Sequence, residues 1–190
     1  LTCGELLLLT YEFTQWLHKH NIPSGAVVSF DGDYSPESLA LFLALASNDN
    51  IMVPLSNDSK HHFVEFREIA QTEFDISLNH HEPHLTCTGR QAGGDIYGHL
   101  RAEQTPGLVL FSSGSTGKSK AIVQDLNKLM SKFTTQRKAL RMLIFLQLDH
   151  IGGVNSLLYS LANQGTVIVA DDRTPDSVCR AIETYKGEVL

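Results

Sequence analysis

The chain has 190 residues, 42% hydrophobic and 19% charged, which is the composition of an ordinary globular protein with room for one sizeable core. Its net charge of −6 argues against general nucleic-acid binding, which needs a basic face, and no apolar run approaches the roughly 20 residues that span a bilayer. The three cysteines are far apart and odd in number, which indicates a reducing, cytoplasmic compartment.

Hydrophobic periodicity predicts alternating helices and strands in the first half of the chain. Ser35-Pro36 is a helix start, with Ser35 as N-cap, and the helix after it is apolar almost all round, which indicates burial between two layers. We expect helices over 3–20, 39–46 and 58–72. We expect strands over 26–30, 51–53 and 74–78, with Pro54 ending the second.

Periodicity fades over 79–106, where we expect a short strand near 85–88 or a long surface connection. The histidines His61-His62 and His80-His81-x-x-His84 invite a metal hypothesis. No pattern of acids and histidines on a clear helix accompanies them, so metal binding is not the expected use of these segments.

The segment 108–125, LVLFSSGSTGKSKAIVQD, is the most informative stretch of the chain. An apolar strand over 108–111 leads into six residues of only Ser, Gly and Thr, and then into Lys118 and Lys120. Glycines allow backbone N–H groups to approach an anion closely, hydroxyls add donors, and lysines supply charge. The residues themselves therefore predict a polyphosphate site.

The rest of the chain continues the alternation of strands and helices. We expect a strand at 121–123, a helix over 126–138 and a strand over 143–148, then a helix opening at 150–153, a strand over 166–170 and a helix starting at 174–176. Short connections between such elements imply an α/β fold of layered, mostly parallel sheets covered by helices.

The loop almost matches the phosphate-binding motif G-x-x-x-x-G-K-[ST] of P-loop NTPases, with Gly117, Lys118 and Ser119 in place and Ser112 at the first glycine position. A loop of that type runs straight into a helix, whereas Ala-Ile-Val after Lys120 prefers a strand. A helix beginning at 117–118 would favour a P-loop NTPase, and a strand would argue against it.

The run 108–121 resembles the phosphate-binding signature of the acyl-adenylate-forming (AMP-binding) enzymes, which include acyl-CoA ligases, luciferases and the adenylation domains of peptide synthetases. Their pattern is a strand, Ser/Thr-Ser-Gly-Ser/Thr-Thr-Gly, then Lys-Pro-Lys-Gly. This sequence departs at Ser119, where Pro is usual, and at Ala121, where Gly is usual. The resemblance extends to 1–6, 25–55 and the segment 148–153, which in the family borders the acyl pocket.

The resemblance implies an enzyme that uses ATP and Mg²⁺ to activate a carboxylic acid as an acyl-adenylate, with release of pyrophosphate. The acyl group then usually passes to a thiol of coenzyme A or of a carrier protein. The residues assigned to ATP are Ser112, Ser113, Gly114, Ser115, Thr116, Gly117, Lys118 and Lys120. Thr116 is the candidate for a hydroxyl near Mg²⁺. His150 is expected at the wall of the pocket as the candidate catalytic group that orients the carboxylate, and Gly152 and Gly153 allow close approach of the substrate.

The family's later motifs do not occur within the 190 residues; they supply a glutamate for Mg²⁺, an aspartate for ribose and a lysine on a mobile C-terminal domain. We therefore expect residues 1–190 to be part of the N-terminal domain, divided roughly into 1–106 and 107–190, without the C-terminal domain and not competent alone. The alternatives are a non-catalytic nucleotide-binding module and a P-loop NTPase.

Overall fold

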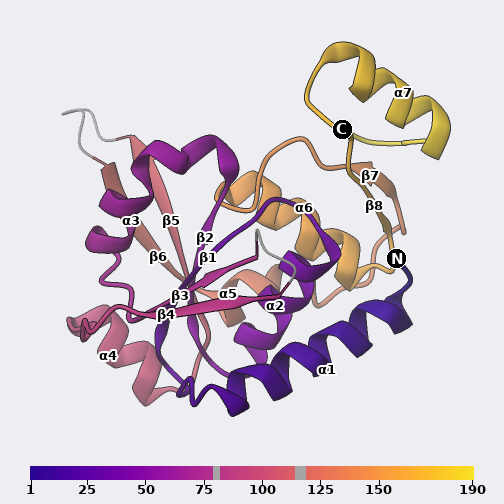
Figure 1. Ribbon diagram of the computed structural model, residues 1–190. Helices are drawn as coiled ribbons and strands as arrows, with labels where there is room; N and C mark the ends of the chain where they lie inside the picture. Colours follow the sequence, from indigo (N-terminus) through magenta and orange to yellow (C-terminus); the bar gives the residue numbers. More distant parts are fainter. Residues whose placement is uncertain (79–81, 114–118) are drawn as a thin grey trace. The chain divides into compact units, whose positions relative to one another are not determined.

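A computed structural model describes residues 1–78, 82–113 and 119–190 (Figure 1). By its internal contacts the chain forms two compact units, Leu1–Leu129 and Met130–Leu190. The sequence suggests a division near residue 106, whereas the strands after that point are hydrogen-bonded into the sheet of the first unit. The phosphate-loop segment therefore belongs, with its two flanking strands, to the first unit.

The first unit is an α/β layer structure built on a six-stranded mixed sheet of order β4-β3-β1-β2-β5-β6. The bounds of its helices and strands in chain order are α1 Cys3–Lys19, β1 Val27–Asp31, α2 Pro36–Ser47, β2 Ile51–Leu55, the 3₁₀ helix η1 Asn57–His62, α3 Phe63–Ile69, β3 Phe74–Ser77, β4 His84–Cys87, α4 Asp95–Ala102, β5 Gly107–Ser113, β6 Ser119–Asp125 and α5 Leu126–Met130.

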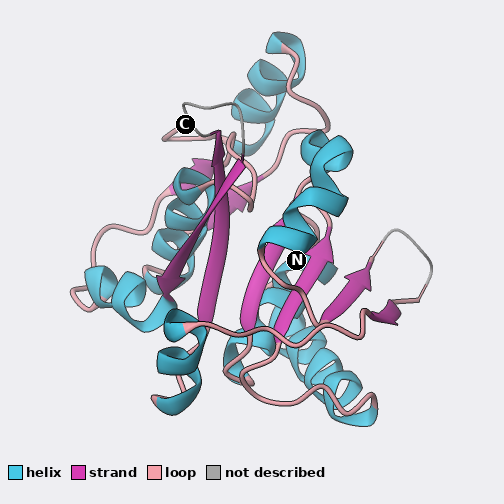
Figure 2. Ribbon diagram, turned by 90° about the vertical axis from the view of Figure 1, so that its left-hand side faces the viewer, coloured by secondary structure: helices cyan, strands magenta, loops and turns pink. Residues whose placement is uncertain are grey.

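The four central strands of this sheet run parallel, and one antiparallel strand borders each edge (Figure 2). The predicted α/β fold with a mostly parallel sheet is confirmed. Pro54 does not end β2, which runs on to Leu55, because the ladder between β2 and β5 stops at Met52 and Leu108. A missing N–H at Pro54 therefore interrupts no bond of that ladder.

Both faces of the central strands are covered, so every residue of β1 and β2 is buried. Helices α3 and α4 pack Phe66, Tyr97 and Leu100 on one face (Figure 1). Helix α2 is buried along most of its length and packs against α1. This confirms the predicted sandwiched position of α2 and explains its lack of a polar face.

Local start signals place these helices where the sequence predicts them. Thr2 and Glu5 form a reciprocal capping box at α1, and the Ser35 hydroxyl accepts a hydrogen bond from the Ser38 N–H, 3.1 Å away, at the start of α2. Pro36 occupies the first turn, as expected. Each signal lies within four residues, so it does not depend on the tertiary structure.

A charged network organises the segment 89–102, in which the sequence shows no clear periodicity. The Glu73 carboxylate accepts hydrogen bonds from the N–H groups of Val27 (2.8 Å) and Ala92 (3.2 Å) and from the Arg101 guanidinium (3.0 Å). Arg101 also donates to the carbonyl oxygens of Gly25 and Ala92. The network fixes α4 against β1 and β3.

The second unit has shorter elements and a smaller core. It contains the 3₁₀ helix η2 (Ser131–Phe133), β7 (Arg141–Leu143), α6 (Ile151–Ala162), β8 (Thr166–Ile168) and α7 (Pro175–Tyr185). Strands β7 and β8 form a parallel pair, and Leu143, Ile168 and Ala181 are the buried members of a small cluster between this pair and α7.

Two predicted elements of this region are wrong in extent. The helix expected over 126–138 ends at Met130, continues as one turn of 3₁₀ helix and then stops. The backbone N–H of Arg137 instead donates to the Asn163 side chain. The strand expected over 143–148 lies at 141–143, because the backbone at 146–147 turns beneath the start of α6.

Candidate functional site

The predicted phosphate loop is the tip of a β-hairpin at one edge of the first unit's sheet. Strands β5 and β6 pair antiparallel from Gly107 and Asp125 up to Ser113 and Ser119. The exposed residues Ser112 and Lys120 lie opposite each other just below the tip. Gly114, Ser115, Thr116, Gly117 and Lys118 lie outside the described residues, so their assignments stay predictions, as does that of the Ser113 side chain.

The element after the loop decides between the two kinds of phosphate loop. Residues Ser119–Asp125 form a strand, not a helix. A loop of the P-loop NTPase type needs a helix whose N-terminus begins at the motif lysine. The P-loop alternative is therefore wrong, and the strand–loop–strand arrangement is the one expected for the adenylate-forming signature.

Helix α3 braces the base of this hairpin. The Phe66 ring stacks on the Phe111 ring of β5, with centroids 3.9 Å apart and an interplanar angle of 5°, and His62 stacks on the Phe66 ring at 5.4 Å. The pKa of Glu65 is lowered, first by a hydrogen bond with His62 (3.0 Å) and then by one with Ser119. Contacts from α3 thus reach the first residue after the loop.

Sequence patterns alone do not reveal this bracing. The sequence suggests His62 only as a metal ligand, yet its partners lie three and four residues further along the chain, at Glu65 and Phe66, which is the spacing of neighbours on one helix face. Within residues 1–78, 82–113 and 119–190, no group of three or more His, Cys, Asp or Glu side chains is placed to hold a metal ion.

In the second unit, His150 is the N-cap residue of α6 and its side chain is 63% exposed. Its Nε2 lies 3.9 Å from Oδ1 of the buried Asp149. Gly153 is required by packing, because a Cβ there would overlap the carbonyl oxygens of Leu146 and Gln147. A Cβ on Gly152 would press against the Leu146 side chain. The roles proposed for His150, Gly152 and Gly153 toward a substrate stay predictions.

A cavity of about 440 Å³ lies beside α6 within the second unit. The side chains that line it come from α6 and from the segment before and within β7: Lys132, Phe133, Arg137, Met142, Asn155, Ser156 and Tyr159. The Phe133 and Tyr159 rings meet edge to face at 6.4 Å. The side-chain amide oxygen Oδ1 of Asn155 is buried and has no hydrogen-bond partner among the described residues. Two cations, two aromatic rings and a buried acceptor suit an organic anion that carries a donor group.

A family model described as "AMP-binding enzyme" matches residues 1–190, the whole chain. The chain belongs to the AMP-binding enzyme family. The resemblance inferred from the loop sequence is thereby confirmed, and it extends over the whole chain. No curated protein matches the sequence closely enough to count as a relative.

Solved structures of AMP-binding enzymes show the same fold. The N-terminal subdomain of Klebsiella oxytoca NpsA, in complex with 3-hydroxyanthranilyl-AMSN, superposes with a TM-score of 0.74 at 22% identity, over 97% of this chain and 51% of that one. The o-succinylbenzoate CoA synthetase MenE from Bacillus subtilis gives 0.76 at 18%, over 100% and 55%. The amide bond synthetase McbA from Marinactinospora thermotolerans gives 0.68 at 20%, over 100% and 44%.

This AMP-binding chain therefore spans about half the length of the solved structures that it matches. At identities near 20%, the likeness shows the fold and not the substrate. Among the residues that the structure describes, no helix is both long and apolar enough to cross a membrane.

Proposed function

We propose that this chain supplies the ATP-phosphate site and part of the acid-binding pocket of an enzyme that converts a carboxylic acid to an acyl-adenylate with release of pyrophosphate. The observation that carries the proposal is the hydroxyl- and glycine-rich sequence with Lys118 and Lys120 that links the paired strands β5 and β6, in a chain that an AMP-binding family model matches throughout. The acyl group then passes to a thiol of coenzyme A or of a carrier protein.

The hairpin suits phosphate binding because its base is held from the side. Stacking of Phe66 on Phe111 and the hydrogen bonds of Glu65 fix both ends of the short connection. Residues on either side of the loop are therefore held in place before an anion binds, which lowers the cost of ordering them on binding. Ser112–Gly117 would then offer N–H groups and hydroxyls to the β- and γ-phosphates, and the Lys118 ammonium would stabilise the negative charge that develops as pyrophosphate leaves.

Mg²⁺ belongs to the proposed reaction, where it would neutralise phosphate charge when bound. In this chain the proposed metal-side group is the Thr116 hydroxyl, and the described residues hold no cluster of ligands of their own. The chain's part is therefore to hold the triphosphate, with Mg²⁺ arriving as its complex with ATP.

The cavity beside α6 supports a carboxylate pocket. Lys132 and Arg137 supply positive charge, and the Phe133 and Tyr159 rings supply flat apolar walls. His150, which precedes the same helix and is not among the residues lining this cavity, is proposed to orient the carboxylate. Two of the solved structures hold ligands of this kind: NpsA is in complex with 3-hydroxyanthranilyl-AMSN, and MenE with the acyl-adenylate intermediate OSB-AMP. An aromatic acid is therefore the first substrate class to test.

The test is carboxylate-dependent exchange of pyrophosphate into ATP by the full-length protein, screened over aromatic and aliphatic acids. We expect exchange with at least one acid, a loss of about 10²-fold or more for Lys118→Ala, and little change for the control Lys19→Ala on α1. We expect no exchange by residues 1–190 alone. Absence of exchange by the full-length protein with every acid, while it still binds ATP, would favour the alternative of a non-catalytic nucleotide-binding module.

A further inference from the structure

A second cavity, of about 270 Å³, lies in the first unit beside α1. Leu9, Phe13 and Trp16 of α1 form one side of it, and Leu78 and Pro83 form another. It is close to β3 and β4, at the opposite edge of the sheet from the β5–β6 hairpin. None of its lining residues belongs to the proposed nucleotide or acid sites, so it is a separate feature of the molecule.

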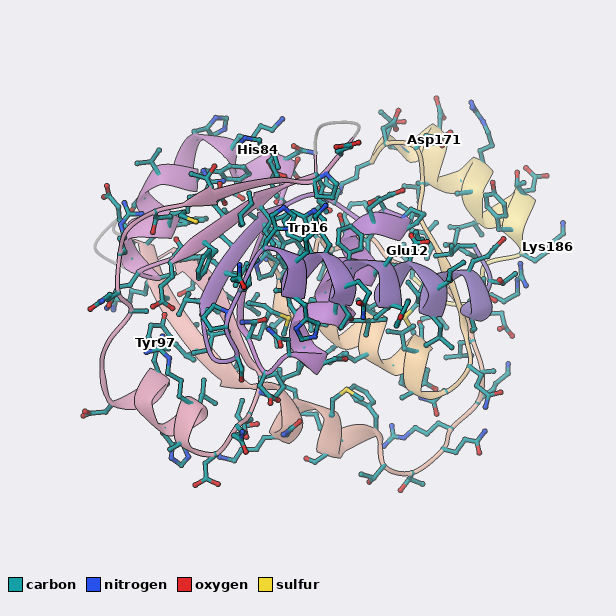
Figure 3. All side chains as sticks on the ribbon, turned by 60° about the horizontal axis from the view of Figure 1, so that its bottom comes forward. Glu12, Trp16, His84, Tyr97, Asp171 and Lys186 are labelled. Atoms are coloured by element: carbon teal, nitrogen blue, oxygen red, sulfur yellow. The ribbon has the colours of Figure 1, made fainter. Side chains whose placement is uncertain are left out.

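Aromatic and apolar groups dominate this cavity. The Phe13 side chain is 7% exposed, and Trp16 is partly exposed at the cavity wall. Figure 3 shows Glu12 and Trp16 along α1, with His84 of β4 across from them. The Trp16 ring packs against the His20 ring, with centroids 4.1 Å apart, and the part of the indole that stays exposed leaves aromatic surface for a ligand. Trp is the aromatic side chain that attracts cations most strongly.

Two carboxylates from separate helices line the same cavity. Glu12 lies in the middle of α1, and Glu37 lies in the first turn of α2. Among the described residues, neither carboxylate has a hydrogen-bond or ion-pair partner. Glu37 also suits the positive end of its own helix. Both carboxylates are exposed, so each can reach a cation that binds in the cavity.

We propose that this cavity binds a small organic cation, an alkylammonium with an apolar body. The apolar chain would contact Leu9, Phe13 and Leu78, and the ammonium group would lie near the Trp16 ring within reach of Glu12 and Glu37. An ammonium is favoured over a metal ion because two carboxylates supply too few ligands for Ca²⁺, while the aromatic and aliphatic walls supply none. The neutral analogue of the same shape would gain only the apolar contacts.

Trp16 is the single tryptophan of the chain, so its fluorescence reports directly on this cavity. The experiment titrates the full chain at neutral pH with hexylammonium, and in parallel with 1-hexanol and hexanoate. We expect a saturable change in Trp16 emission with hexylammonium, and affinities at least about tenfold weaker for the other two compounds. Added salt should weaken hexylammonium binding and leave 1-hexanol unaffected.

Substitutions separate the charge from the apolar walls. Glu12→Gln and Glu37→Gln should each weaken hexylammonium binding several-fold, whereas the matched control Glu103→Gln, at the end of α4, should not. Glu12→Lys should abolish binding, because it places a tethered ammonium at the site. Thermal unfolding of each variant shows that it is folded.

Three outcomes would overturn the proposal: no saturable response of Trp16 in the folded wild-type chain, equal affinity for hexylammonium and 1-hexanol, or Glu12→Gln and Glu37→Gln variants that bind like Glu103→Gln. None of these outcomes bears on ATP binding at the hairpin. The proposed function and this inference therefore fail independently.

Discussion

Each unit of the chain uses one glutamate to join segments that are distant in sequence, and the two glutamates differ in setting. In the first unit Glu73 accepts hydrogen bonds from Val27 and Ala92 and from the Arg101 guanidinium, and its side chain is only 18% exposed. In the second unit Glu188 accepts from the Arg141 N–H (3.0 Å) and from the Lys138 ammonium (2.8 Å), with 38% of its side chain exposed.

Similar hydrogen bonds to a glutamate therefore contribute differently to stability, according to how far water reaches them. Around Glu73 stands a core in which residues of β1 and β2 are fully buried, whereas Glu188 lies beside strands of three residues with a small apolar cluster. Water screens the Glu188 pair and competes for its hydrogen bonds. We therefore expect the sheet that carries the β5–β6 hairpin to be much more rigid than the short strands around α6.

The largest expected contrast lies in the two cores. Ile51→Ala in β2 removes a fully buried side chain from the cluster under α3 and α4, and we expect it to lower the free energy of unfolding by about 3–4 kcal/mol. Ile168→Ala in β8 should lower it by about 2 kcal/mol, because that smaller cluster has more room to relax.

Denaturant unfolding followed by Trp16 fluorescence monitors the first unit, and amide exchange of β7 and β8 monitors the second. Equal losses for the two variants, or a larger loss for Ile168→Ala, would remove the contrast between the cores.

The next contrast is between a largely buried ion pair, Glu73–Arg101, and an exposed one, Glu68–Arg90. Glu73→Gln preserves shape but removes the charge that Arg101 faces, and we expect a loss of about 2 kcal/mol in the stability of the first unit. The matched control Glu68→Gln, whose side chain is 62% exposed and 4.0 Å from Arg90, should change stability by less than about 0.5 kcal/mol. Urea titration of both variants decides this, and a harmless Glu73→Gln would show that the Glu73 charge adds little to the packing of Tyr97 and Leu100 and to the hydrogen bonds of Arg101 with Gly25 and Ala92.

For Glu188→Gln we expect no measurable change in melting temperature in moderate salt, although the pKa of Lys138 is raised by its hydrogen bond with Glu188. The substitution should return the Lys138 pKa toward its ordinary value, which NMR titration of the Lys138 side chain would report. A clear fall in melting temperature would mean that the exposed pair contributes as the buried network does.

The smallest effect concerns pH at the base of the hairpin. The Glu65 pKa is lowered by His62 and then by Ser119, so the carboxylate's contribution is present above the ordinary Glu pKa of about 4.3 and is lost as pH falls through the lowered value. Amide exchange at Ser119 should therefore accelerate in acid, and should be faster in Glu65→Gln than in the wild type at neutral pH. An NMR titration midpoint for Glu65 at or above 4.3 would contradict this account.

Local signals made most of the fold predictable. The capping residues Thr2, Ser35 and Thr174 act on amides three residues away, so the sequence placed α1, α2 and α7 correctly. By contrast α4 begins at Asp95 after the N-cap residue Gly94, which has no side chain to cap it, and the helix depends on the Arg101–Glu73 contact across 28 residues. No local pattern encodes such a contact, so the sequence does not predict this helix.

The candidate site likewise has some features that the local sequence predicts and others that depend on the tertiary structure. The strand–loop–strand order was predictable because the loop composition and the β-branched run after Lys120 are local, whereas the antiparallel pairing of the two strands was not predicted. Its bracing by Phe66 and Glu65 depends on α3 meeting β5 and β6, which only the tertiary structure brings together. The cavity beside α6 is also lined by Arg137 and Met142. The sequence predicts Arg137 within a helix that ends before it, and it does not predict that β7 begins at Arg141 and includes Met142. The sequence therefore does not predict this cavity.

The most direct test of the central claim is a titration of the chain with ATP, followed by backbone amide NMR. The account predicts shifts concentrated between Ser112 and Lys120, abolished by Lys118→Ala and retained by Lys19→Ala. ATP binding that leaves the hairpin amides unchanged, or that survives Lys118→Ala undiminished, would contradict it.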